Sequence, residues 1–121
     1  MAYGRAAMKK VNIRSCIGFF RLLLESAHVQ AWIMALKSGE SSSPSPENEH
    51  PRAEQWVYVI SGAGKAVIND RRYSLSEGML LLIQQRETHQ ITNTGRRTLV
   101  TLNLYAPPAY TADGEVRRSI K

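Results

Sequence analysis

Two stretches of this 121-residue chain carry the residue types best suited to chemistry. Residues 48–62, NEHPRAEQWVYVISG, set His50 ahead of a carboxylate and a carboxamide and then run through aromatic and branched residues to a glycine turn. Residues 78–93, GMLLLIQQRETHQITN, lead from a glycine turn through an apolar run and a polar corner to His89. A histidine imidazole can ligate a metal ion or hydrogen-bond a ligand. We expect His50 and His89 to meet in one pocket.

The segments that must position these histidines have the pattern of short β-strands. Runs of four to eight residues rich in strand formers, closed by glycine, asparagine or serine turns, indicate an antiparallel sandwich or barrel. Periodicity leaves the first run open between a strand and a helical turn, and we favour the strand. We expect strands at residues 17–25, 29–37, 55–61, 65–68, 72–75, 79–83, 90–92 and 98–105.

The length of the chain suits one domain with a single core. We expect an N-terminal arm over residues 1–16, a barrel over 17–110 and a C-terminal tail over 111–121 that leaves the sheet at two consecutive prolines. Serine and proline dominate residues 39–46, GESSSPSP, which predicts a flexible surface loop without helix or sheet. A lid over the pocket is the alternative for this loop.

Composition excludes several classes of site. The single cysteine, Cys16, excludes an internal disulfide and a cysteine-based metal cluster. The net charge is +6, but the basic residues are scattered as pairs at turns and in the tail, which favours a solvated surface over a nucleic-acid partner. Arg14 and Arg21 interrupt the apolar run near the N-terminus, which argues against a signal peptide. We expect a cytoplasmic protein that does not enter a membrane.

Residues 30–110 resemble a small single-domain cupin, which implies an all-β fold, the double-stranded β-helix or jelly-roll barrel. In the second sequence motif of that family, Gly78, His89 and Asn93 occupy their usual positions without a gap. Gln84 replaces the usual proline, and Arg86 replaces the usual glycine. The ending YAPPAY is similar to that of small cupins described as sugar-phosphate isomerase-like on fold alone.

The first cupin motif carries two histidines and a glutamate, and it is only partly matched here. His50 takes the second histidine position, Asn48 stands in the first, and Gln55 stands in the glutamate position. Strand parity turns Glu54 to the opposite face from Gln55 unless a bulge intervenes. The resemblance implies His50, Gln55, His89 and Asn48 as ligands of a divalent iron, manganese, nickel, copper or zinc ion. Two neutral amide oxygens compensate less charge than a carboxylate would, so hydrogen-bonded histidines without metal remain the alternative.

Strand alternation extends the predicted pocket beyond the histidines. The side chains expected to line a pocket for a small-molecule ligand are Gln30, Trp32, Met34, Val57, Val59 and Tyr105. The strand that carries Val57 and Val59 has Trp56, Tyr58 and Ile60 on its opposite face, and this apolar set predicts a homodimer.

Three functions stay open from the sequence. One is a metal-dependent enzyme acting on a small polar molecule, with isomerase or dioxygenase chemistry both compatible. Another is a metal-free module that binds or senses a small molecule. The third is an interaction protein that works through its basic surface, for which charge is the only argument. The identity of the substrate does not follow from the sequence, because one fold hosts many chemistries.

Overall fold

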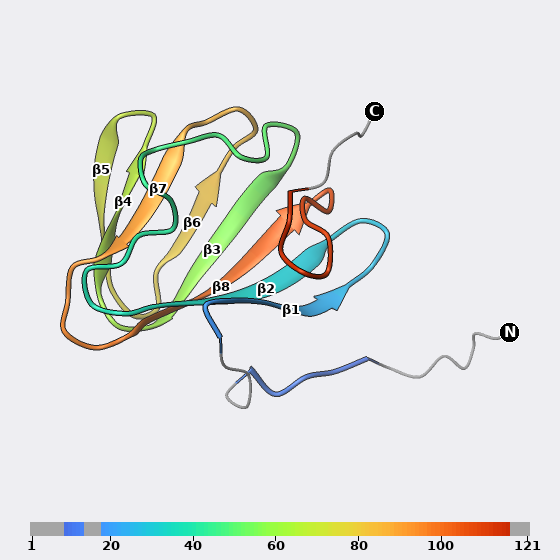
Figure 1. The fold of residues 1–121 in the computed structure, drawn as a ribbon, viewed down its shortest axis with the longest axis horizontal. Helices are drawn as coiled ribbons and strands as arrows, with labels where there is room; N and C mark the ends of the chain where they lie inside the picture. Colours follow the sequence, from blue (N-terminus) through green and yellow to red (C-terminus); the bar gives the residue numbers. More distant parts are fainter. Residues whose placement is uncertain (1–8, 14–17, 117–121) are drawn as a thin grey trace, which may run out of the picture.

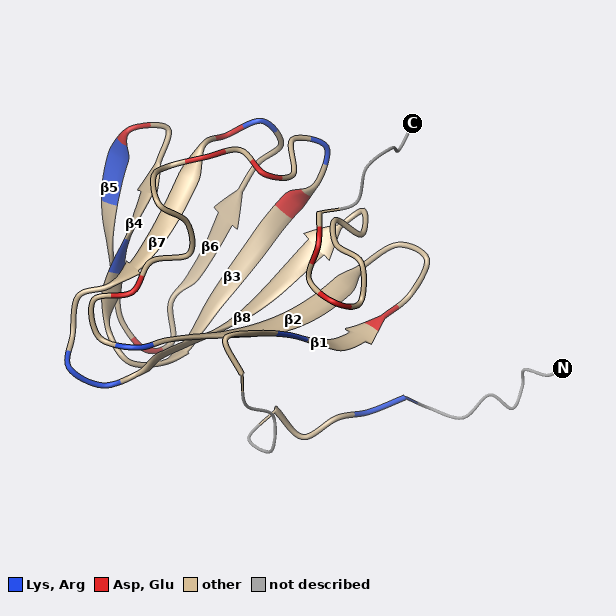
Figure 2. Ribbon diagram, viewed as in Figure 1, with Lys and Arg blue, Asp and Glu red and all other residues tan. Residues whose placement is uncertain are grey.

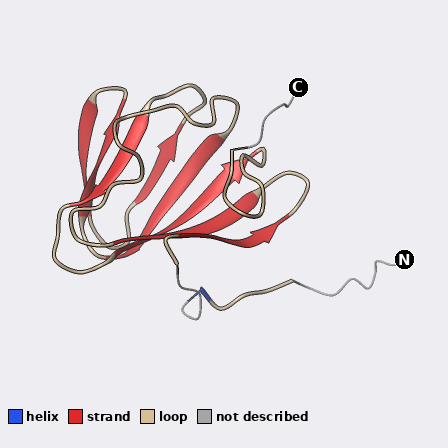
Figure 3. Cartoon of the chain, viewed as in Figure 1, coloured by secondary structure: helices blue, strands red, loops and turns tan. Residues whose placement is uncertain are grey.

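The computed structural model describes residues 9–13 and 18–116, and these form two antiparallel β-sheets (Figures 1 and 3). One sheet has the strand order β1-β2-β8-β3-β6, and the other has the order β5-β4-β7. The strands are β1 (Phe20–Glu25), β2 (Gln30–Leu36), β3 (Glu54–Ser61), β4 (Gly64–Ile68), β5 (Arg71–Leu75), β6 (Leu80–Ile83), β7 (His89–Asn93) and β8 (Leu99–Ala106). This arrangement confirms the jelly-roll fold and the eight predicted strands, including the ambiguous first one.

The predicted N-terminal arm lies largely outside the described residues, as does the end of the predicted tail. Within the described part of the tail, Tyr110 forms an isolated bridge with Val116. The tail therefore turns back on itself after the prolines, next to the barrel. No helix in the described ranges is long and apolar enough to span a membrane.

Burial alternates along the strands because successive side chains point to opposite faces of a sheet. Strand β8 shows this regularly, with every second residue from Leu99 to Tyr105 buried. The inward side chains form a main core of Met34, Leu36, Val57, Val59, Ala66, Ile68, Leu75, Ile83, Ile91 and Leu99. A second, aromatic cluster contains Trp32, Ala53, Tyr105, Ala109 and Tyr110.

Residues 39–50, here called the strap, pair with β7 at two points (Figure 1). Ser41 forms a bridge with Thr92, and Glu47 exchanges two backbone hydrogen bonds with His89 at 2.8 and 3.0 Å. The prediction of a loop without sheet pairing over residues 39–46 is therefore wrong at Ser41. The physical reason is that β7 is an edge strand, whose open backbone groups need partners.

The outer face of the five-stranded sheet is apolar and partly exposed. Tyr58 is 42% exposed, and its cross-strand partners Leu80 and Leu102 continue the apolar surface on both sides. Strands β2, β6 and β8 contain no charged residue, and β3 contains only Glu54, as the tan ribbons in Figure 2 show. A surface of this kind is unusual on a monomer that stays apart from other chains.

Gly64 sits where β4 passes close to its neighbours, and we predict that Gly64→Ala destabilises the barrel. An added Cβ would collide with the backbone oxygen of Thr92 and would lie 2.8 Å from Leu99 Cδ2. Overpacking of this kind costs about 1–3 kcal/mol of unfolding free energy, which urea denaturation measures. Gly95→Ala is the matched control, because the nearest atoms to its Cβ lie at 3.6 Å. Equal stability of the two variants would contradict this account.

Candidate functional site

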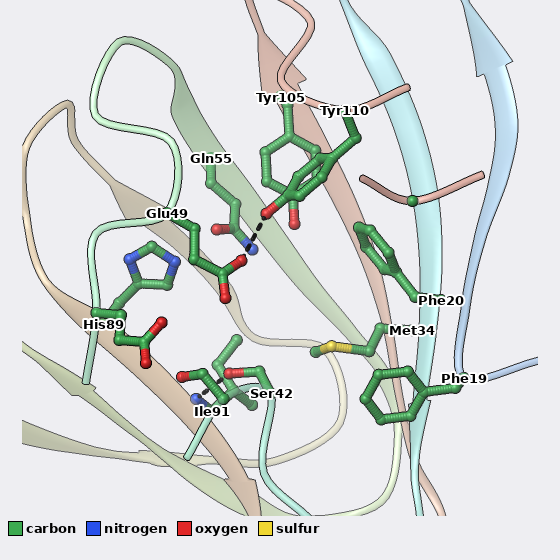
Figure 4. Close-up of a pocket in the computed structure, with 13 residues that line it drawn as sticks. Phe19, Phe20, Met34, Ser42, Glu49, Gln55, His89, Ile91, Tyr105 and Tyr110 are labelled. Carbon is green, nitrogen blue, oxygen red and sulfur yellow. Dashed lines mark hydrogen bonds between the residues drawn. The ribbon is translucent and has the colours of Figure 1, made fainter. Parts of the chain in front are cut away.

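A cavity of about 180 Å³ lies between the two sheets beneath the strap (Figure 4). Strands of both sheets contribute to it, together with the strap, the segment before β1 and the tail. It is lined by Phe19, Phe20, Met34, Ser42, Ser43, Glu47, Glu49, Gln55, His89, Ile91, Tyr105, Tyr110 and Gly114.

The cavity has a polar side and an apolar side. In Figure 4, His89, Glu49 and Gln55 lie opposite Phe20 and Met34. Two carboxylates, from Glu47 and Glu49, belong to the lining. No lysine or arginine of the described ranges is part of it, although the chain as a whole carries a net charge of +6. The cavity therefore differs in charge from the surface of the molecule.

The two histidines lie side by side, as predicted. His89 opens β7 and His50 ends the strap, and their ring centroids are 4.8 Å apart. The pairing of Glu47 with His89 brings them together, because it fixes the strap alongside β7. Both side chains are buried, and His50 lies behind the cavity wall, edge-on to Tyr105.

Backbone carbonyls orient both imidazole rings. His50 Nδ1 lies 3.2 Å from the oxygen of Ala53, and His89 Nδ1 lies 3.1 Å from the oxygen of Glu87. A carbonyl oxygen only accepts hydrogen bonds, so Nδ1 of His89 carries the proton and its Nε2 carries a lone pair. This arrangement is the one that histidine ligands of metal ions usually adopt.

Gln55 places a second acceptor against His50. Its Nε2 donates to Asn103 Oδ1 at 3.0 Å, which leaves its Oε1 facing His50 Nε2 at 3.0 Å. Both nitrogens of His50 therefore face oxygen acceptors, one from Ala53 and one from Gln55. A neutral imidazole has only one N–H and satisfies only one of them. The other contact needs a further proton or a cation.

His89 is neutral at physiological pH. Its pKa lies at about 4 instead of 6.5, mainly because burial disfavours the charged imidazolium and also because His50 is nearby. The hydrogen bond to the Glu87 carbonyl and the charge of that residue oppose the shift only in part. The lone pair on Nε2 is thus available across the whole neutral range.

Tyrosines and a glutamate complete the polar side. The hydroxyl of Tyr110 donates to Glu49 Oε1 at 3.1 Å. Burial is the main cause that raises the pKa of Tyr105 and of Tyr110 above its ordinary value, so both hydroxyls remain protonated donors. The arrangement combines a carboxylate, two phenol donors and a neutral imidazole in one small cavity.

The predicted site residues divide into two groups. Gln55, His89, Met34 and Tyr105 line the cavity, and His50 and Asn48 do not. The strap instead contributes the residues on either side of Asn48, which the sequence analysis had not selected. Strand parity holds at the start of β3, where Glu54 faces outward and accepts a hydrogen bond from Trp56 Nε1 at 2.9 Å.

Four other predicted ligand contacts belong to the framework of the barrel and do not line the cavity. Val57 and Val59 pack in the main core, and Trp32 stacks on Phe20 with ring centroids 4.3 Å apart. Gln30 is fully buried and holds the tail, since its Oε1 accepts hydrogen bonds from the backbone of Ala109 and Tyr110 at 3.0 Å each. These side chains are inward-facing, as parity predicted, but other residues separate them from the cavity.

Sequence reasoning missed Ser42, Ser43, Glu47, Glu49 and Tyr110. The prediction of a loop, with a lid as the alternative, covered residues 39–46 and assigned none of their side chains to a face. A signal was present in Glu47 and Glu49, which flank Asn48 just before His50, but its meaning depends on the pairing with β7.

A carboxylate-rich metal centre is not present in the described part of the chain. No three histidine, cysteine, aspartate or glutamate side chains of residues 9–13 and 18–116 are grouped so that they could hold a metal ion.

Known proteins of the cupin family are similar to this chain in sequence and in fold. The family described as a cupin domain matches residues 32–105. The crystal structure of BH2720 from Bacillus halodurans superposes with a TM-score of 0.78 at 26% identity and covers 93% of this chain and 89% of that one. A predicted oxalate decarboxylase from Thermotoga maritima superposes with a TM-score of 0.63 at 20% identity, over 74% of this chain and 79% of that one.

A curated relative is similar over a shorter region. Protein SchB of Streptomyces halstedii is 35% identical over 63 residues, which are 52% of this chain. The match spans only 44% of that protein.

The buried, neutral state of His89 predicts a loss of stability in mild acid. The folded pKa of about 4 lies below the unfolded value of 6.5, so the unfolded chain binds the proton first as the pH falls. The stabilisation is complete above about pH 6.5 and declines toward pH 4, with a loss of about 2 kcal/mol by about pH 5.

Urea denaturation at about pH 7.5 and about pH 5, with a chelator present, measures this loss in the wild type and in His89→Gln. The variant should lack that part of the pH dependence. An identical decline in both proteins would show that other groups cause it.

Proposed function

This chain belongs to the cupin family, and on that premise we propose that its cavity binds one divalent metal ion and acts on a small polar molecule without net charge. The proposed ligands are His50, His89 and Gln55. The observation that carries the proposal is that both ring nitrogens of His50 face oxygen acceptors, of which Gln55 Oε1 lies 3.0 Å from Nε2. A neutral imidazole donates to only one of them, and a cation held by His50, Gln55 and His89 would satisfy the other contact.

Three side chains that lie close together would hold the ion. Nε2 of His50 lies 3.0 Å from Gln55 Oε1, and the ring centroids of His50 and His89 are 4.8 Å apart. Neither Asn48 nor His50 lines the cavity, but His50 belongs to the set because its Nε2 lies 3.0 Å from Gln55 Oε1.

The surroundings supply the charge that the three ligands lack. Glu47 and Glu49 line the same cavity and favour a cation there, even though the direct ligands are neutral. The carbonyl of Glu87 holds Nδ1 of His89 and leaves the lone pair on its Nε2, and Nε2 of His50 faces Gln55.

The cavity favours an uncharged substrate over a phosphate or carboxylate. Its lining offers no guanidinium or ammonium among the described residues to pair with an anion, and it has an apolar wall from Phe20, Met34 and Ile91. A dry cavity of about 150 Å³ holds one benzene molecule, so about 180 Å³ suits a single substituted ring or a compound of similar size.

The proposed chemistry is that of an isomerase or an oxygenase on a hydroxyl or carbonyl compound. A bound ion polarises such a group by acting as a Lewis acid. Tyr110 donates a hydrogen bond to Glu49, which places that carboxylate in the cavity wall where it can accept a proton from a substrate hydroxyl. Tyr105 keeps its own proton and acts as a donor to a substrate oxygen.

A metal-free binding module is the second candidate. It is favoured by one observation, that no group of three histidine, cysteine or acidic side chains within the described ranges is arranged around a metal position. In this case the same histidines, glutamates and tyrosines hold a ligand through hydrogen bonds alone. The two candidates predict different results in metal binding.

Metal analysis decides between them. After reconstitution with Mn²⁺, Fe²⁺, Ni²⁺, Cu²⁺ or Zn²⁺, we expect about one ion per chain, and we expect His50→Ala and His89→Ala each to weaken binding at least about 100-fold because a direct ligand is lost. Elemental analysis and calorimetry measure stoichiometry and affinity. His28→Ala is the matched control, because His28 is exposed and distant in sequence from the site. A wild-type protein that stays metal-free would favour the binding module.

We also propose that the chain forms a homodimer through the outer face of the five-stranded sheet. The exposed apolar residues on this face include Tyr58, Leu80 and Leu82, and they adjoin Trp56 across the strand pairs. Burying such a surface against a second copy removes it from water.

Light scattering at micromolar concentration should give the mass of two chains, and Tyr58→Glu should give the mass of one because it buries a charge in the interface. Tyr73→Glu is the control, since Tyr73 is 43% exposed against 42% for Tyr58 but lies on the other sheet. A monomeric wild type would refute the proposal.

A further inference from the structure

We propose that Asn103 is a positioning residue, which is oriented by the backbone carbonyl of residue 101 and holds the amide of Gln55 with its oxygen toward His50, so that the cavity is prepared for a cation. The inference deepens the proposed function and rests on it for the identity of the ion. Its structural content concerns only the orientation of one buried amide.

The orientation begins at a backbone carbonyl, which only accepts hydrogen bonds. Asn103 Nδ2 lies 3.2 Å from the oxygen of Thr101 and 2.9 Å from its Oγ1. If the amide of Asn103 were reversed, two oxygens would face each other at the Thr101 carbonyl. The nitrogen of Asn103 therefore points to Thr101, and its oxygen points to Gln55.

The same argument passes from Asn103 to Gln55. Because Asn103 Oδ1 is an acceptor, the atom of Gln55 at 3.0 Å from it must be the nitrogen. The oxygen of Gln55 is then left facing His50 Nε2. The carbonyl of Thr101 therefore fixes the orientation of the Asn103 amide, which in turn fixes the orientation of the Gln55 amide beside His50.

Burial makes this orientation persistent. Thr101 and Asn103 are 0% exposed and Gln55 is 3% exposed, so water does not replace a lost partner. Leaving one buried donor or acceptor unsatisfied costs about 1–3 kcal/mol. In strand register, Thr101 pairs with Val59 and Asn103 with Val57, on an inward face where apolar residues would also pack. The hydrogen bonds run from Thr101 through Asn103 to Gln55, which contacts His50, so these polar side chains do more than fill the core.

The orientation decides what His50 meets. With the amide reversed, Gln55 would donate an N–H to Nε2 of His50 and occupy the lone pair that an ion needs. With the observed orientation, the ligand-competent oxygen lies beside that nitrogen. Outer groups that orient a ligand commonly change metal affinity by about 10–100-fold.

The test compares Asn103→Leu with Thr101→Val. Leucine keeps a similar volume but releases the amide of Gln55, whereas valine removes only the hydroxyl of Thr101 and leaves its carbonyl in place. Nitrogen-15 NMR of the metal-free proteins reports which ring nitrogen of His50 carries the proton. We expect protonated Nε2 in the wild type and in Thr101→Val, and a shift of the proton to Nδ1 in Asn103→Leu.

Calorimetric titration with Mn²⁺ and Zn²⁺ then follows the same proteins, with at least about tenfold weaker binding expected for Asn103→Leu alone. An unprotonated Nε2 in the metal-free wild type, or no change in Asn103→Leu, overturns the inference. If the proton shifts as expected but no protein binds metal, the orientation stands and the metal proposal fails. Asn103→Ala repeats the test if leucine prevents folding, which circular dichroism detects.

Discussion

The site depends on the pairing of the strap with the open edge of β7. Two backbone hydrogen bonds join Glu47 to His89, and they bring chain segments 42 residues apart in number into register. Without this contact, His50 would have no fixed place beside His89, and the carboxylates of Glu47 and Glu49 would not line a cavity. The backbone groups of the edge strand β7 require hydrogen-bond partners, and the strap that supplies them also brings the histidines and glutamates of the site together.

Hydrogen-bond polarity then determines what those groups can do. In the described part of the chain, every buried side-chain nitrogen or oxygen has a partner within hydrogen-bonding distance. At His50, however, both partners are acceptors, because the carbonyls of Ala53 and Thr101 set the direction of the bonds from either side. A neutral His50 has one N–H for these two acceptors, so one of its two contacts lacks a proton. That imbalance is the physical basis for expecting a cation in this cavity.

Local sequence patterns were enough to predict the strands. Alternation and turn residues act over a few positions, so they identified all eight strands and put Gln55 on one face with Val57, but the choice between Glu54 and Gln55 for the pocket came from the structure. The long-range contacts were not predictable in this way. Gln30 holds the backbone of Tyr110, which lies 80 residues away in the sequence, and Tyr110 reaches Glu49 across 61 residues. No local period encodes such pairs, so the tail was not recognised as part of the cavity wall, and residues 39–46 of the strap entered only through the alternative of a lid.

The net charge of the chain does not predict the charge of the cavity. The chain carries a net charge of +6, yet lysines and arginines lie mainly on β5 and the loops, while the strap carries Glu40, Glu47 and Glu49 (Figure 2). Arg97, for example, has a side chain that is 85% exposed and is therefore strongly screened by solvent. The glutamates of the cavity act at short range on whatever binds there, where screening is weaker. A cation is thus favoured inside a basic protein, and the total charge indicates how the surface meets water but not what the cavity accepts.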